Sequence, residues 1–295
     1  MNISELFIFL LCCCIACIFL LRWYGFTFSS LPSERSKNAK RIFGILPLVV
    51  AAMITYTLEG LASFDVINNP FWTFFYIVIG FAWVYGGLTA MSLCFDLSWI
   101  DDALNLNNKA ALIAITGGLI GITTIYSGAN IGDGPGWWCV FLAGGLGMIS
   151  WFALGIIINI TAKVFYHITV ERDIYCGIRV GSYFLASGII LGRASAGDWT
   201  SFEMTVIEFY DGWPVVILTA IMIAVELYGV NQFINNTGKP KFNSFSRSDA
   251  AAAAAVPTTD KMLRISIIIG ILYVVLAVAS VILLPSLPHN PIYGR

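Results

Sequence analysis

The sequence has little charge and few of the side chains that usually catalyse reactions. Only 11% of its 295 residues are charged and 58% are hydrophobic, whereas about a quarter of an average soluble protein is charged. The net charge of −1 gives no reason to expect a nucleic-acid partner. The two histidines, His167 and His289, are too few and too distant for paired haem ligands or an ordinary zinc site. We therefore expect no cofactor.

The sequence motifs of common enzyme classes are also missing. It contains no GxSxG nucleophile motif, no phosphate-binding P-loop and no HExxH zinc motif. The GDGPG run at residues 132–136 does not link a strand to a helix, so it predicts a turn rather than a phosphate site. The seven cysteines form no disulfide framework. The sequence predicts a protein that is not an enzyme.

Long apolar runs dominate what is present. They come in blocks of roughly 20 residues, the length that a helix needs to cross about 30 Å of hydrocarbon. The predicted fold class is all-α, a polytopic transmembrane helical bundle that forms one integral membrane domain over residues 1–295. No basic residue precedes the first run, so we expect a retained helix rather than a signal peptide. The spans are expected at about 5–22, 42–62, 71–94, 109–128, 137–163, 176–195, 213–234 and 264–285.

Basic residues fall almost entirely in alternate links between these runs. Because Lys and Arg are retained on the cytoplasmic side, those links, including a loop at 235–263, are predicted to be cytoplasmic, with both termini on the outer side. The other links hold only Arg193 and Arg295. The basic residues assigned to the inner links are Arg22, Arg35, Lys37, Lys40, Arg41, Lys109, Lys163, Arg172, Arg179, Lys239, Lys241, Arg247, Lys261 and Arg264.

Three helical hairpins look like copies of one another. Their outer links, at residues 65–72, 133–138 and 211–214, each combine an aspartate with a proline and a tryptophan. All three hairpins run in the same direction, so the repeat is parallel rather than inverted. Local chemistry offers a second explanation, since Asp, Gly and Pro form turns and Trp prefers the membrane interface. The tryptophans expected to anchor the interface are Trp72, Trp137, Trp138 and Trp213.

The second and third copies are the most alike. Residues 107–118, NNKAALIAITGG, and 172–183, RDIYCGIRVGSY, share a polar start, a small-residue entry and a glycine-containing apolar span. This pattern resembles the tandem two-helix repeats of the bacterial YjfL-like family, small inner-membrane proteins of unknown function. The resemblance covers about residues 100–235. It implies a bacterial inner-membrane location and supplies no catalytic residue.

Glycines at four-residue spacing predict close helix packing. They form the pairs Gly117 and Gly121, Gly177 and Gly181, and Gly188 and Gly192. A missing side chain lets two backbones approach and gain dispersion contacts, which matters where lipid supplies no hydrophobic drive. Both intramolecular packing and a homo-oligomer or partner interface fit this pattern.

Ionisable groups within spans are candidates for function because their burial is costly. Glu59 lies near the outer end of the second span and Glu226 in the inner half of the seventh. No Lys or Arg is predicted mid-span to pair with them, although Arg193 is placed to meet Glu59. These residues predict either an ion path or interface positions.

The outer links are predominantly acidic. They contain Asp65, Asp133, Asp198, Glu203, Glu208 and Asp211. Such a rim attracts cations or a basic partner, or merely reflects exclusion of basic residues from this side. Within residues 202–209, Glu203 and Glu208 alternate with apolar residues, which predicts a short helix on the outer surface.

Two functions follow from these observations. The first is a non-catalytic accessory or scaffold subunit of a membrane complex, in contact with the lipid bilayer and with other subunits or copies of itself. The second is a small cation or solute transporter that uses Glu59, Glu226 and the outer acids. The few polar residues of the spans favour the first.

Overall fold

The computed structural model describes residues 2–29, 37–237 and 260–283, without the side chains of 229–237. This part of the chain is helical and contains no β-strand. Eight of its helices are long and apolar enough to cross a membrane, which confirms the predicted fold class. They are α1 (Ile3–Phe28), α2 (Lys37–Gly60), α3 (Pro70–Phe95), α4 (Lys109–Ala129), α5 (Trp137–Ala162), α7 (Ile174–Ala194), α9 (Pro214–Thr237) and α11 (Asp260–Leu283).

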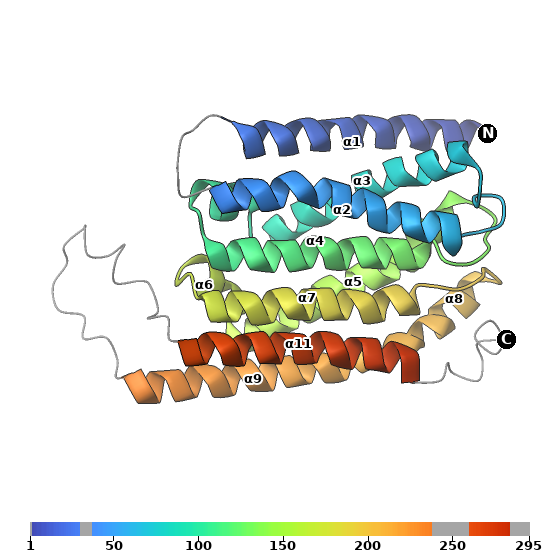
Figure 1. Ribbon diagram of the computed structural model, residues 1–295. Helices are drawn as coiled ribbons and strands as arrows, with labels where there is room; N and C mark the ends of the chain where they lie inside the picture. The colour runs from blue at the N-terminus through green and yellow to red at the C-terminus, as the bar shows by residue number, and fades with distance from the viewer. Residues whose placement is uncertain (1, 30–36, 238–259, 284–295) are drawn as a thin grey trace.

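The eight helices form two layers (Figure 1). In the first layer α2, α4, α7 and α11 lie side by side, each in contact with the next. In the second layer α1, α3, α5 and α9 follow one another in the same way. Because successive spans alternate in direction, the helices of each layer are parallel to one another. The molecule is a row of antiparallel pairs.

The two ends of the bundle, where the helices begin and finish, differ in charge, and we name them accordingly. The basic end is where the first-layer helices begin, and its exposed residues include Lys37, Lys109 and Arg172. The acidic end is where they finish. The predicted loop at 235–263 is partly helical, because α9 continues to Thr237 and α11 begins at Asp260; its remainder, 238–259, lies outside the described residues. Arg35, Lys239, Lys241, Arg247, His289 and Arg295 also lie outside them.

Glycines bring α4 and α7 into backbone contact. A Cβ atom added at Gly117 would lie 2.0 Å from the carbonyl oxygen of Gly181, and one at Gly188 would lie 2.5 Å from the Cα of Gly121. Closer to the ends of the pair, Gly177 faces Ala110 in the same way. Gly192 lies against the backbone of Thr124. All six predicted packing glycines therefore lie in one interface within the chain.

The two connections at the basic end that precede α4 and α7 share one backbone plan. Two helices of the second layer end in a left-handed residue, Asp96 after α3 (φ 52°) and Lys163 after α5 (φ 50°). A short helix follows in both, the π-helix η2 (Trp99–Asn105) and the α-helix α6 (Val164–Thr169). The two connections lie far apart in the sequence. They are therefore separate segments that adopt the same backbone plan.

The same plan continues into the next helices. Asn107 (φ 50°) and Arg172 (φ 53°) each take a left-handed conformation directly before the N-cap residue. The N-caps, Asn108 and Asp173, accept hydrogen bonds from the first turn of α4 and α7, and the amide of each donates to a carbonyl six residues earlier at 2.9 Å. The start of α4 and the start of α7 are thus built alike.

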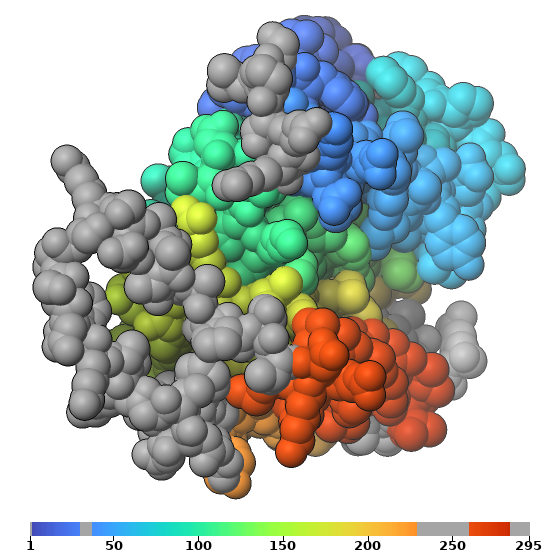
Figure 2. Space-filling view, turned by 60° about the vertical axis from the view of Figure 1, so that its left-hand side comes forward, coloured from blue at the N-terminus to red at the C-terminus, as the bar shows by residue number. Residues whose placement is uncertain are grey.

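Apolar side chains cover the outside of the bundle. Leu21 of α1 and Ile282 of α11 are 76% and 72% exposed, and many large hydrophobic residues of these helices resemble them. In Figure 2 the green of α4 and the yellow of α7 lie between the blue of α2 and the orange-red of α11, so these two helices are at the centre of the first layer and the other two at its edges. Such a surface requires hydrocarbon around it, so the chain is an integral membrane protein.

Gly117→Ala is expected to destabilise the bundle because the new methyl group would collide with the Gly181 backbone, which cannot rotate away. Overpacking of this kind costs about 1–3 kcal/mol or more. Gly145→Ala in α5 is the matched control, since a Cβ there meets nothing within 4 Å. Unfolding of both variants in detergent by increasing SDS would measure the difference. Equal midpoints for the two variants would show that the glycine contact does not stabilise the fold.

Candidate functional site

Three connections meet at the acidic end: 61–69 between α2 and α3, 130–136 between α4 and α5, and 195–213 between α7 and α9. The first two are joined through their backbones. Gly132 donates its N–H to the carbonyl of Leu61 at 3.2 Å, and Ala62 and Gly132 form a parallel β-bridge. The amide of Phe64 donates to Oδ1 of Asp133 at 3.2 Å. The side chain of Asp133, which the sequence places in the second link, therefore holds the first link in position.

The third connection joins the second at the same place. The Asp133 amide donates to Oδ1 of Asp198 at 2.7 Å, and the Trp199 amide donates to the Asp133 carbonyl at 2.7 Å. Gly132 has φ +104°, and a Cβ there would lie 2.5 Å from the backbone of Gly197. Glycine is required at 132 both for this conformation and for this approach. Asp133 is the residue at which all three connections meet.

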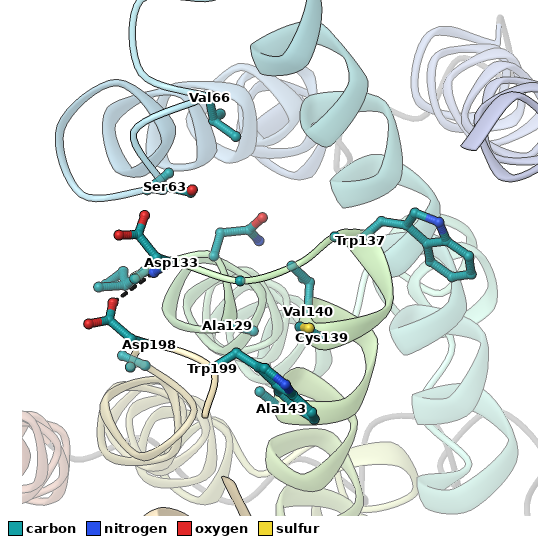
Figure 3. Close-up of a pocket in the computed structure, with 18 of the residues that line it drawn as sticks. Ser63, Val66, Ala129, Asp133, Trp137, Cys139, Val140, Ala143, Asp198 and Trp199 are labelled. Atoms are coloured by element: carbon teal, nitrogen blue, oxygen red, sulfur yellow. Dashed lines mark hydrogen bonds between the residues drawn. The ribbon is translucent and has the colours of Figure 1, made fainter. Parts of the chain in front are cut away.

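A cavity of about 280 Å³ lies beneath this joint. Figure 3 shows Asp133 and Asp198 facing each other on one side of it, with Cys139 and Trp199 on another. Carboxylates from four parts of the chain line it, and its lining contains no lysine, arginine or histidine among the described residues. These carboxylates are Glu5, Asp65, Asp133, Asp198 and Glu208.

Aromatic and small residues complete the wall of the cavity. Trp72, Trp137 and Trp199 line it, and Trp199 packs edge-on against Trp138 with ring centroids 4.6 Å apart. Aromatic faces attract cations, and carboxylates in a partly enclosed space strengthen that attraction. The arrangement is suited to holding a positively charged group. In the part of the chain that the structure describes, no three His, Cys, Asp or Glu residues come together as metal ligands.

The remaining residues predicted at this end lie apart from the cavity. Glu59 is exposed at the end of α2, and the structure places no ion pair between it and Arg193 among the described residues. Arg193 lies in the last turn of α7, and its neighbour Ala194 packs against Gly212. Asp211 lies in the 3₁₀ helix η3 (Phe209–Gly212), while Trp213 beside it is 48% exposed.

The short helix predicted on the outer surface is present as α8 (Phe202–Glu208). Its N-cap is Ser201, whose hydroxyl accepts the amide of Met204 at 3.1 Å. Glu208 is only 6% exposed, so this carboxylate turns toward the cavity instead of toward solvent.

The second polar site lies within the bundle and contradicts one sequence prediction. Arg179 does not belong to an inner link; it is inside α7, where its guanidinium forms a two-point ion pair with Glu226 of α9. Nε donates to Oε1 at 2.5 Å and Nη2 to Oε2 at 2.8 Å. Nη1 donates to Oγ of Ser266 in α11 at 2.9 Å. The prediction that no basic residue pairs with Glu226 was wrong.

This junction of α7, α9 and α11 contains further buried polar groups. The hydroxyls of Tyr183 and Thr219 are 2.7 Å apart. The hydroxyl of Tyr273, a residue with 0% exposure, has no hydrogen-bond partner among the described residues. At the basic-end edge of the junction, burial raises the pKa of the Asp173 carboxyl above its ordinary value, and the nearby Arg179 offsets part of that rise.

The sequence contained a signal for the ion pair. Arg179 lies five residues after the first residue of α7, more than one helical turn inside an apolar run. A basic residue near the start of a span also fits the role of a topology marker. A charged residue at that depth requires a partner, and Glu226 is the buried acid at a similar depth on the neighbouring α9.

No family model, curated protein or solved structure matches this chain. The resemblance of residues 100–235 to the YjfL-like repeats therefore stays a prediction.

Arg179→Met is expected to destabilise the protein by about 3–5 kcal/mol, because it leaves the Glu226 carboxylate buried without its partner. The double variant Arg179→Met/Glu226→Leu removes both charges and should recover most of that loss. SDS unfolding of the two single variants and the double variant forms the thermodynamic cycle. If the losses of the single variants simply add, the two side chains are not coupled and the ion pair contributes nothing.

Proposed function

We propose that this protein is a non-catalytic accessory subunit that docks a positively charged segment of a partner at its acidic end. One observation carries the proposal: three sequence-distant connections are hydrogen-bonded into a single surface around a cavity lined by five carboxylates and, among the described residues, no basic side chain. At about 280 Å³ the cavity lies at the lower limit of the volumes of ligand pockets, so it suits a small group such as one side chain. A lysine or arginine of a partner fits its charge and its tryptophan walls.

The alternative is a cation or solute transporter, and the buried Arg179–Glu226 pair is the observation in its favour. Transport requires a polar route between the two ends of the bundle. Aromatic rings fill much of the interior instead: Phe95, Trp151 and Phe184 are fully buried, with centroids 4.4–5.9 Å apart. This packing favours the accessory subunit.

We further propose that the acidic end faces away from the cytoplasm in a bacterial inner membrane, as the distribution of basic residues and the YjfL-like resemblance suggest. The shared plan of the connections before α4 and α7 supports duplication of the hairpins. Cysteine labelling of intact cells tests the orientation. A cysteine at exposed Phe64 should react with an impermeant maleimide, whereas one at exposed Lys109 should not.

The triple variant Asp65→Asn/Asp133→Asn/Asp198→Asn tests the docking surface. Asparagine keeps the Oδ1 atoms that accept the amides of Phe64 and Asp133 and the hydroxyl of Ser63, so the joint should persist while three charges are lost. Because an exposed ion pair contributes about 0.2–1 kcal/mol, partner binding should weaken about tenfold.

The measurement is photo-crosslinking from benzoylphenylalanine at position 64, which replaces a phenylalanine that is 81% exposed beside the cavity. The crosslinked chain is identified by mass spectrometry, and its yield is compared between the two backgrounds. Glu203→Gln is the control, an exposed acid at the same end that does not line the cavity. A yield that is unchanged by the triple variant would exclude charge-driven docking here.

An ion-flux assay in liposomes addresses the transporter. For an accessory subunit, we expect the wild-type protein and the double variant Glu59→Gln/Glu226→Gln both to give the same ion flux as empty liposomes. A wild-type flux that disappears in the variant would overturn the accessory function in favour of transport.

A further inference from the structure

The cavity at the acidic end opens to the outside of the bundle. Asp133, Gly134 and Pro135 line it and are themselves exposed. Trp138, which is 42% exposed, packs edge-on against Trp199 of the lining, so an aromatic surface continues from the cavity to the outside. A ligand that fits this site therefore combines a positively charged group for the cavity with apolar groups for the tryptophans around it.

The chain itself supplies such a sequence beyond the end of α11. This helix finishes at Leu283, at the acidic end, and residues 284–295, which lie outside the described residues, continue as LPSLPHNPIYGR. This segment, which we call the tail, contains Arg295 and neither Asp nor Glu. The other arginine assigned to this end, Arg193, does not line the cavity. The tail thus carries a charge opposite to that of the carboxylates in the cavity.

The prolines of the tail are spaced to suit an aromatic surface. Pro285, Pro288 and Pro291 recur at every third residue. Because a polyproline II helix has about three residues per turn, this spacing predicts that the three prolines share one face of an extended segment. Segments of this kind bind to grooves lined by aromatic side chains. The tryptophans in and beside the cavity present such a surface.

The tail is long enough to reach the cavity. Helices α11, α7 and α4 lie side by side, and the connection that follows α4 lines the cavity (Figure 1). Packed helices lie about 8–10 Å apart, so the two steps from α11 to α4 cover about 20 Å. A segment as long as residues 284–295 extends about 37 Å in the polyproline II conformation. Arg295, at the far end of the tail, is therefore within reach of the carboxylates.

We propose that the tail docks on the acidic end of its own chain, with the guanidinium of Arg295 in the cavity and the prolines against Trp138 and Trp199. A guanidinium presents a fork of N–H donors that matches carboxylate oxygens, and no covalent bond changes. The docked tail occupies the surface that a positively charged segment of a partner needs, so the two compete. This competition rests on the docking function proposed above, whereas the docking of the tail does not.

Photo-crosslinking in the purified full chain, reconstituted in nanodiscs without a partner, tests the docking. Benzoylphenylalanine replaces Phe64, whose amide bonds to Asp133 beside the cavity. We expect mass spectrometry of the digested protein to find the tail joined to position 64. Arg295→Gln should reduce this crosslink about tenfold, because a hydrogen bond between charged groups contributes about that factor to an equilibrium. Arg295→Lys keeps the charge and should retain more of the crosslink than Arg295→Gln.

Matched controls separate docking from random collision. The tail variants lie beyond Leu283, the last residue of α11, so the bundle keeps its helices. The triple asparagine variant of the cavity should lower the crosslink as Arg295→Gln does, whereas Glu203→Gln should not, since Glu203 does not line the cavity. Benzoylphenylalanine at Tyr210 probes an exposed position at the same end outside the cavity lining. Any crosslink from there to the tail should not depend on Arg295.

The proposal is overturned if position 64 does not crosslink to the tail. It is also overturned if the yield is the same in the wild type, Arg295→Gln and the triple variant. In a one-to-one mixture of isotopically heavy and light chains, we expect crosslinks within one label. Crosslinks that join heavy to light chains as often as chains of one label would assign the cavity to the tail of a second copy and overturn docking within the chain.

Crosslinking in cells separates this proposal from the docking of a partner. If the tail competes, Arg295→Gln should raise the yield of the partner crosslinked from position 64, whereas the triple variant lowers it; an unchanged yield in Arg295→Gln would overturn the competition. A partner captured in cells without any tail crosslink in the purified protein would support the accessory function and overturn this proposal. A carboxylate-dependent tail crosslink without a partner in cells would support tail docking and remove the accessory function.

Discussion

The backbone contact between α4 and α7 is the constraint on which the rest of the structure depends. Gly117 and Gly181 meet with no side chain between them, and the contact extends along most of both helices. It fixes the distance between the two central helices of the first layer. That distance in turn brings Gly132 and Gly197 together at the acidic end and sets the two similar connections side by side at the basic end. The connections at the two ends of α4 and α7 are held in place by this apolar contact.

Much of the fold was predictable from the sequence because each span signals itself. An apolar run of about 20 residues is long enough to span the hydrocarbon as a helix, and this length can be read without knowing its neighbours. The helix caps at Asn69, Asn108 and Asp173 are equally local, since a side-chain oxygen satisfies amides one turn away. The glycine pairs predicted close packing, but not which helices would pack. Spacing within one helix carries no information about its partner.

The candidate site was predictable only in part. Asp65 and Asp133 stood out as acids in the links, yet their convergence depends on hydrogen bonds between segments that are far apart in sequence. Asp198 was noticed only as one more acid of the rim, although its carboxylate binds the Asp133 amide. Arg179 was misread because a basic residue near a span end has two meanings, topology and pairing. Only its depth in α7 separates them.

The order of the chain gives the α4–α7 contact a consequence for biosynthesis. Helix α4 enters the membrane before α5, α6 and α7 have been made, so its row of glycines first faces lipid. This exposure is tolerable because the backbone of α4 already bonds to itself and leaves no polar group unsatisfied. What α4 lacks until α7 arrives is the close dispersion contact between its glycine face and the α7 backbone. The centre of the bundle is therefore completed late, by the sixth span, after the five earlier spans have entered the membrane.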